Sequence, residues 1–396
     1  MTSRERMQTA LTGGTPDMVP TFLCYSGMYL NRHTTLEYFA EYLRRMGDRD
    51  RYPFDPQEDA ELRRRAIKQT LDLFTGRVDY QFGFPNIRAV ECQDLTRAYI
   101  DLVVRYVDAE SVRVYDDGSG PSVDGVRPHG NWDRTAKLDT EADVDRHFEP
   151  RPSASPSPKR TEQDPFADLR VLHKEAISEL SRVAGFTTPF ASAIGAFSYQ
   201  GAMMAVHDKP KVFAHFIERA VEQRLKAVGS AGEADWFWFD EYYTDDISPE
   251  HYERYVFGPN VRIAKAIRES GKPCMYYFCG DIMSKLDKAL QLEVDALAFE
   301  ESKKWFRVDL AEVKKRVGHR KALVGNMDGM HLLPRGSREQ VAEEAKRQLA
   351  AAASEGGFIM GAGSPIAPDT PTENMLTFLD TTRELGRYPM DWLEEA

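Results

Sequence analysis

From about residue 185 onward, short apolar runs alternate with longer stretches whose apolar residues recur at helical spacing. This alternation predicts strands that are each followed by a helix, and hence a parallel sheet. Because each strand is short and the connections are short, the pattern favours a closed (β/α)8 TIM barrel over an open sheet. The expected strands are 185–190, 235–240, 273–278, 296–299, 322–324 and 358–361, and the expected helices are 168–183, 197–206, 212–229, 249–270, 282–290, 309–317, 338–353 and 371–385.

The first part of the chain has a less regular pattern. We expect an N-terminal helix over 2–12, capped by Thr2 or Ser3, strands at 18–23 and 78–84, and charged surface helices within 35–75. Apolar and polar residues alternate between 99 and 132, and Asp-Gly steps at Asp117 and Asp124 predict turns. We therefore expect one barrel domain over 1–396 with N-terminal helices, a β-hairpin insertion over 99–150 and a flexible Pro- and Ser-rich loop over 151–165.

Composition narrows the classes of function. The net charge of −11 argues against nucleic acid and against an anionic membrane surface as partners. No apolar run reaches the roughly 18 residues of a membrane span, and the N-terminus lacks the apolar core of a signal peptide. Four cysteines without paired spacing suggest a reducing compartment. These features predict a cytoplasmic enzyme that acts on a small molecule.

Chemically useful side chains follow the predicted strands. The run Met275–Phe278 ends on Cys279-Gly280-Asp281, which places a thiol and a carboxylate at one strand end. In a barrel of parallel strands, the carboxyl ends of the strands meet at one mouth, where active sites form. The other strand-end residues are Cys24, Tyr25, Asn86, Thr188, Asp240, Glu241, Tyr242, Glu300, Glu301, Asn326, Asp328 and Ser364. The simpler alternative is that Asp281, Asp328 and Ser364 only cap the helices that follow them.

Two kinds of chemistry suit this set. One is a metal site with Cys279 and Glu300 as ligands, for which zinc is the natural ion. The other is acid–base catalysis by carboxyl groups of shifted pKa. The catalytic candidates are Asp240, Glu241, Tyr277, Glu301 and Asp328, and the substrate-binding candidates are Cys24, Tyr25, Tyr242, Asp281, Asn326 and Ser364. His331 is the histidine nearest a strand end, although a surface role explains it as well.

Several of these strand ends resemble motifs of the uroporphyrinogen decarboxylase superfamily, which includes the decarboxylase and the corrinoid- and coenzyme-M-linked methyltransferases. The matching segments are 26–30 (SGMYL), Asp240 with 247–250 (ISPE), 278–281 (FCGD), 325–328 (GNMD) and 363–374 (GSPIAPDTPTEN). Their order and spacing carry the resemblance, which implies a (β/α)8 barrel.

Departures from the family motifs narrow the activity. The decarboxylase holds its substrate's carboxylates with two arginines, and those positions resemble Cys24 and Met28 here. Porphyrinogen decarboxylation is therefore disfavoured. The zinc methyltransferases use a His-x-Cys pair and a later Cys, which correspond to Tyr277, Cys279 and Ser364. The resemblance still allows an altered zinc site with fewer ligands, formed by Cys279 and Glu300. The predicted insertion resembles that of corrinoid-linked methyltransferases.

The resemblance implies a methyltransferase that moves a methyl group from a methyl ether or a quaternary amine to a corrinoid on a partner protein. One alternative is a cofactor-free decarboxylase or lyase of a small carboxylic acid, in which Asp240 and Tyr277 deliver protons. Another is a barrel that binds ligands without catalysis. A homodimer is left open, because the sequence does not give the oligomeric state.

Overall fold

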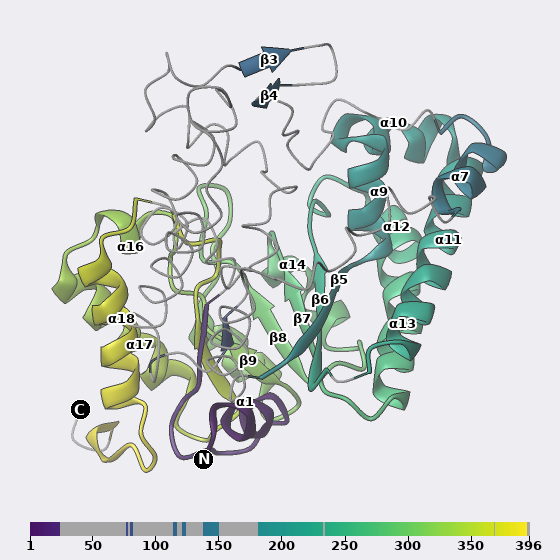
Figure 1. The fold of residues 1–396 in the computed structure, drawn as a ribbon. Helices are drawn as coiled ribbons and strands as arrows, with labels where there is room; N and C mark the ends of the chain where they lie inside the picture. Colours follow the sequence, from purple (N-terminus) through teal and green to yellow (C-terminus); the bar gives the residue numbers. More distant parts are fainter. Residues whose placement is uncertain are drawn as a thin grey trace, which may run out of the picture.

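The computed structural model describes residues 1–23, 77, 80–81, 114–116, 121–123, 138–149, 181–232, 234–367 and 369–393. A sheet of eight parallel strands lies at its centre (Figure 1). The strands are β1 (Thr21–Leu23), β2 (Tyr80–Gln81), β5 (Val183–Thr187), β6 (Trp236–Glu241), β7 (Cys274–Phe278), β8 (Ala296–Phe299), β9 (Ala322–Val324) and β10 (Phe358–Gly361). Their order, β2-β1-β10-β9-β8-β7-β6-β5, is that of a TIM barrel opened between β2 and β5. The parallel α/β fold is confirmed, and closure into an eightfold barrel stays a prediction.

Helices follow the strands and cover the outside of the sheet, with α9, α11 and α13 on one side of Figure 1 and α17 and α18 on the other. Those after β5 are α9 (Pro189–Phe197), α10 (Tyr199–Asp208), α11 (Pro210–Gly229), α12 (Pro249–Tyr252), α13 (Gly258–Glu269), α14 (Ile282–Ala289), α15 (Leu310–Val317), α16 (Leu332–Arg335), α17 (Arg338–Ala352) and α18 (Thr372–Leu385). A short 3₁₀ turn, Asp391–Leu393, ends the described chain. Among the described residues, no helix is both long and apolar enough to cross a bilayer.

The N-terminal helix α1 (Ser3–Leu11) closes the end of the sheet at which the strands begin (Figure 1). Thr2 and Glu5 form a capping box, which confirms the predicted cap. Three apolar side chains of α1 join the cluster inside the curved sheet: Met7, Ala10 and Leu11. The interior of the sheet is therefore packed with apolar side chains at this end.

Alternation along each strand separates the interior of the sheet from the helix layer. Trp236 and Trp238 of β6 belong to the interior cluster, whereas Phe237 and Phe239 pack toward the helices. Trp238 stacks between two rings inside the sheet, with its centroid 5.4 Å from that of Phe22 and 5.0 Å from that of Tyr277. These stacked rings form the packed floor beneath the carboxyl ends of the strands.

Three predicted elements near β5 have wrong boundaries. The expected strand 185–190 ends at Thr187, because the Thr188 hydroxyl caps a helix that begins at Pro189. The expected helix 197–206 is split at Ser198, whose positive φ of 65° ends α9 and starts α10. The expected helix 168–183 lies outside the described residues up to 180, and its last residue, Val183, begins a strand.

The other expected strands and helices after residue 206 are confirmed to within a few residues. The expected helix 249–270 is observed as α12 and α13 joined by a π turn, Glu253–Phe257. Strands at 296–299, 322–324 and 358–361 have the predicted bounds. At the start of the chain, β1 and β2 lie within the two expected strands.

The predicted insertion is described only in part. Within it, β3 (Val114–Asp116) pairs antiparallel with β4 (Pro121–Val123), across the turn expected at Asp117. Its last part forms a helix, α7 (Glu141–Phe148), which packs against α11. The remaining residues of 99–132, the predicted helices of 35–75 and the loop 151–165 lie outside the described residues.

Candidate active site

A cavity of about 1070 Å³ lies at the carboxyl ends of β6, β7 and β8. Aromatic and acidic side chains dominate its described lining. The lining residues are Tyr199, Asp240, Tyr242, Tyr243, Asp245, Asp246, Tyr277, Cys279, Gly280, Glu300, Trp305, Phe306 and Pro365. Five predicted site residues thus lie on one cavity, namely Asp240, Tyr242, Tyr277, Cys279 and Glu300.

The two acids at the end of β6 face opposite sides of the sheet. Asp240 lines the cavity and is only 5% exposed. Glu241 is fully buried toward the helix layer, where its Oε2 accepts a hydrogen bond of 2.9 Å from Asn260 of α13. Burial raises the pKa of Glu241 to about 8. Glu241, a predicted catalytic residue, therefore does not line the cavity.

Three tyrosines form one wall of the cavity. The ring centroid of Tyr243 lies 5.1 Å from that of Tyr242 and 5.5 Å from that of Tyr199. Tyr243 has a positive φ of 62°, a conformation that non-glycine residues seldom adopt. The Tyr199 hydroxyl donates a 2.5 Å hydrogen bond to Asp246, which raises the pKa of Tyr199 to about 12. This wall joins residues from α10 and from the loop after β6.

The end of β7 supplies the floor and a thiol. Tyr277 donates a 2.5 Å hydrogen bond to the carbonyl oxygen of Gly363, which ties β7 to the loop after β10. Burial, followed by the charge of Glu300, raises the pKa of the Cys279 thiol well above its usual value. Cys279 is therefore a neutral thiol at neutral pH.

The turn after β7 holds an acid from the loop after β6. Gly280 has a φ of +125°, and the Asp245 carboxylate packs directly against it. The backbone N–H of Asp281 donates to Asp245 Oδ2 at 3.0 Å. The Asp281 side chain itself caps α14 by accepting from Met283 and Ser284. The capping interpretation therefore accounts for Asp281, which does not line the cavity.

A compact ionic cluster follows β8. The Lys303 ammonium contacts the Glu301 carboxylate, lies 2.6 Å from Ser364 Oγ and lies 3.7 Å from Glu300 Oε1. Ser364 in turn donates to Glu300 Oε1 at 3.2 Å, and the Gly280 N–H donates to Glu300 Oε2 at 3.0 Å. Burial is the largest influence and lowers the pKa of Lys303, but the hydrogen bond to Glu301 and the negative charges of Glu301, Glu300 and Asp328 together outweigh it, so the pKa lies above its usual value. The lysine therefore stays charged.

The predicted residues after β9 have structural partners. Asn326 is 5% exposed, and its side-chain amide donates to the Glu300 carbonyl oxygen at 3.3 Å. Asp328 Oδ1 accepts from the backbone N–H groups of Met330 and His331 in the turn before α16, but it does not cap that helix as the alternative expected. The His331 ring is exposed and lies 3.4 Å from Asp328. Asp328 thus orders the turn before α16 and does not line the cavity.

The predicted zinc site does not fit the described side chains. Zinc sites in proteins use three or four side-chain ligands, and among the described residues no group of three His, Cys, Asp or Glu side chains is placed to hold a metal. Both oxygens of Glu300 already accept hydrogen bonds. Tyr277 and Ser364, which stand at positions of zinc ligands in the resemblance, are engaged elsewhere. No chemical step is therefore derived through zinc.

Sequence reasoning missed the residues that reach the cavity from loops and helices. They are Tyr199, Tyr243, Asp245, Asp246, Trp305 and Phe306. Lys303 of the ionic cluster, which lies beside the cavity, was missed as well. The acid-rich stretch 240–246 was a usable signal for Asp245 and Asp246. The candidates Cys24 and Tyr25, and Asn86, lie outside the described residues. Thr188 is buried and caps α9.

Parallel strands, outer helices and a cavity at the carboxyl ends of the strands define a TIM-barrel-like protein. The family model of uroporphyrinogen decarboxylase (URO-D) matches residues 135–385, more than half of the chain. The chain belongs to this family, which confirms the resemblance in its motifs.

Relatives in the family are named as two kinds of enzyme. The uroporphyrinogen decarboxylase of Carboxydothermus hydrogenoformans is 24% identical over 237 residues, which are 58% of this chain and 65% of that enzyme. The methylated-thiol–coenzyme M methyltransferase of Methanosarcina mazei is 26% identical over 144 residues, or 36% of each chain. The chain thus spans less than two thirds of the length of these relatives. A solved methyltransferase structure from Methanosarcina mazei shares the fold, with a TM-score of 0.56, 18% identity and coverage of 97% of this chain and 99% of the other.

Proposed function

We propose that this protein is a methyltransferase that takes a methyl group from a small quaternary ammonium compound and passes it to a corrinoid on a partner protein. The single observation that carries the proposal is the lining of the cavity. Its described residues combine aromatic rings with four carboxylates, from Asp240, Asp245, Asp246 and Glu300, and include no lysine, arginine or histidine. The methyltransferase relative supports methyl transfer as a reaction within the family.

Such a lining suits a cation. The face of an aromatic ring attracts a quaternary ammonium group, and each contact contributes about 0.5–2 kcal/mol according to how far it is desolvated. Carboxylates add attraction that grows as water leaves the cavity. A carboxylic acid substrate would meet four acids and no basic group in the described lining. The decarboxylase alternative therefore has no support from the described cavity.

The bond that breaks also favours the ammonium over the methyl ether. When the methyl group leaves a quaternary nitrogen, the electron pair of the C–N bond stays on nitrogen and the product is a neutral amine. A methyl ether would leave as an alkoxide, which needs a proton donor or a Lewis acid. The quaternary ammonium substrate requires neither the zinc site nor an acid in the cavity, which agrees with the engagement of both Glu300 oxygens in hydrogen bonds.

The residues of this chain bind and orient the substrate in this scheme. Because the positive charge of the substrate is lost during transfer, the carboxylates contribute mainly to binding and selection rather than to acceleration. The exposed rings of Tyr199, Tyr243 and Trp305 give the rim an aromatic surface on which a corrin ring can pack. A bound corrinoid would supply the electron pair that receives the methyl group.

The test is a methyl-transfer assay with free cob(I)alamin, in which loss of the Co(I) absorbance is followed. The methyl donors are tetramethylammonium, choline, methoxybenzene and dimethyl sulfide, each added alone. We expect transfer from the two ammonium compounds and little from the others. Absence of transfer from every donor would contradict the proposed reaction. Transfer from methoxybenzene alone would support methyl transfer but contradict a cationic substrate.

Two adjacent acids provide a matched pair of variants for this assay. Asp240→Asn removes a charge from the cavity and should raise KM for the ammonium donor at least tenfold, with a smaller effect on kcat. Glu241→Gln alters the neighbouring residue, which faces away from the cavity and hydrogen-bonds Asn260. It should leave both constants within about twofold. Equal effects of the two substitutions would argue against the cavity as the binding site.

A further inference from the structure

A lysine, Lys303, lies close to Glu300, the carboxylate that the sequence predicts as a zinc ligand. Lys303 comes three residues after Glu300, and the chain between them turns so that the ammonium contacts the Glu301 carboxylate. The same ammonium lies 2.6 Å from Ser364 Oγ, at the end of β10. One cation therefore joins the loop after β8 to the loop after β10, beside the cavity.

The surroundings of this ammonium are largely closed to water. Ser364 and Glu301 are 1% and 5% exposed, and the Lys303 side chain is 16% exposed. The loop is held in shape by Ser302, which exchanges hydrogen bonds with the backbone of Val308 in both directions. The Lys303 side chain is thus held in place by its neighbours and differs from a mobile lysine on the surface.

The ammonium and a divalent ion would compete for the same carboxylate. Glu300 Oε1 lies 3.7 Å from Lys303 Nζ and accepts a hydrogen bond from Ser364. Zinc binds a carboxylate oxygen at about 2.1 Å, so an ion on Glu300 Oε1 would lie within about 6 Å of the fixed positive charge. Ser364, the second group that would face such an ion, already accepts a hydrogen bond from the same lysine.

We propose that the Lys303 ammonium takes the place of a metal cation beside Glu300, at the carboxyl ends of the strands. It orients Glu300 and Ser364, and it excludes a divalent metal ion from Glu300 and Cys279. Lys303 acts as a positioning residue, because it lies beside the described lining of the cavity and not in it. This proposal does not depend on methyl transfer, because it concerns which cation lies beside Glu300 and its test measures metal binding.

The test uses Co²⁺ as the probe, because a cobalt–thiolate bond gives a characteristic charge-transfer absorption. Ser364→Cys supplies a second thiol beside Glu300 and is combined with three residues at position 303: the native Lys, Lys303→Arg and Lys303→Met. We expect no thiolate band for the wild type, for Ser364→Cys or for Lys303→Arg/Ser364→Cys. Lys303→Met/Ser364→Cys should bind at least a hundredfold more tightly than Ser364→Cys, and its band should vanish when Cys279→Ser is added.

Three results would overturn the proposal. They are a Cys279-dependent band in the wild type, equal cobalt affinity with and without Lys303, and no binding by Lys303→Met/Ser364→Cys. Circular dichroism and thermal melting of each variant show whether it is folded. The arginine variant separates charge from packing, because it keeps the positive charge while it changes the size and shape of the side chain.

Discussion

Asp240 and Glu241 are adjacent carboxylates that meet different environments because side chains alternate along a strand. Asp240 lines the cavity, whereas Glu241 lies between β6 and α13 and is fully buried. Burial without a counter-charge favours the protonated form of a carboxyl group. Glu241 is thus a neutral hydrogen-bonding group of the core at neutral pH, since its pKa is raised to about 8.

Glu241→Gln should therefore change how stability depends on pH. The folded-state pKa of about 8 lies above the ordinary value of 4.5, so the folded protein keeps a proton that the unfolded protein has lost in this window. The contribution of Glu241 is fully present below the unfolded pKa and is lost as pH rises toward about 8, by at most about 1.4 kcal/mol per pH unit. Urea unfolding of both proteins between about pH 5 and 8 measures this, and wild type should lose stability relative to the variant as pH rises. Parallel curves would show that the pKa of Glu241 is not raised.

The position of a residue relative to its strand could be predicted from sequence, but its partner could not. Asp240, Cys279 and Glu300 line one cavity because each ends an apolar run and is in register with the side chains of its strand that point into the interior of the sheet. Asp281 and Asp328 follow strands too, yet their carboxylates accept N–H groups of the next turn. The competition between capping a helix and facing a cavity is decided by loop geometry, which a single sequence does not report. Lys303 and Tyr199 were missed for the same reason, since a loop and a helix bring them to the mouth.

The turn from β7 to α14 shows how an element positions the cavity. Gly280 has a φ of +125°, and a Cβ at this residue would lie 2.6 Å from Asp245 Oδ2. The glycine thus allows the loop after β6 to pack onto the loop after β7. Both loops contribute lining residues, so this turn sets the width of the cavity between them.

Gly280→Ala should destabilise the protein and weaken ligand binding. Gly271→Ala is a matched control, because Gly271 also has a positive φ, of +75°, but a Cβ there would meet nothing within 4 Å. Both substitutions incur a backbone cost of about 1–3 kcal/mol, because both residues have a positive φ. Only the first displaces Asp245. Thermal melting and choline titration should show a larger loss for Gly280→Ala in both measurements, and equal losses would mean that the contact with Asp245 does not matter.

Elements with uninterrupted apolar runs were predicted correctly, whereas the boundary between β5 and α9, which the Thr188 cap sets, was not. The bounds of β8, β9 and β10 follow directly from their apolar residues. The predicted strand 185–190 ran on because Phe190 is apolar, but Thr188 and Pro189 start a helix whose first turn buries that ring. Reading the threonine as a cap would have placed the boundary correctly.

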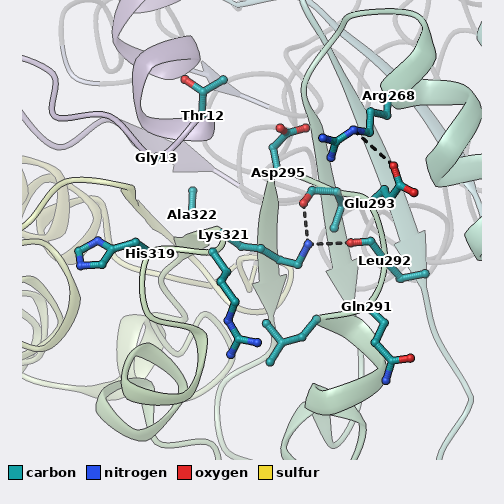
Figure 2. A pocket seen from close by; sticks show the side chains of 13 residues that line it. Thr12, Gly13, Arg268, Gln291, Leu292, Glu293, Asp295, His319, Lys321 and Ala322 are labelled. Carbon is teal, nitrogen blue, oxygen red and sulfur yellow. Dashed lines mark hydrogen bonds and ion pairs between the residues drawn. The ribbon is translucent and has the colours of Figure 1, made fainter.

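The two ends of the parallel strands each border a cavity. At the end opposite to the proposed active site, a cavity of about 320 Å³ lies between α1 and the starts of β8 and β9. Figure 2 shows Lys321 reaching across this cavity to the carbonyl group of Leu292, and its ammonium also donates to the carbonyl oxygen of Val294. In TIM barrels this end contributes to stability and the carboxyl end to activity.

Lys321→Met should therefore destabilise the protein while leaving methyl transfer intact. The substitution leaves two carbonyl oxygens without their donor, which costs about 1–3 kcal/mol if they remain buried. Urea unfolding measures the loss of stability, and the methyl-transfer assay should give a kcat within about twofold of wild type. A large loss of kcat at full folding would show that the two ends are coupled.

The most direct test of the account compares binding of choline with binding of its neutral carbon isostere, in which a quaternary carbon replaces the nitrogen. The two ligands have the same shape and differ in charge, so calorimetric titration isolates recognition of the cation by the aromatic and acidic lining. We expect at least about a tenfold preference for choline, equivalent to about 1.4 kcal/mol, and a loss of most of that preference in Asp240→Asn. Equal affinity for the two ligands, or a preference that Asp240→Asn leaves unchanged, would contradict it.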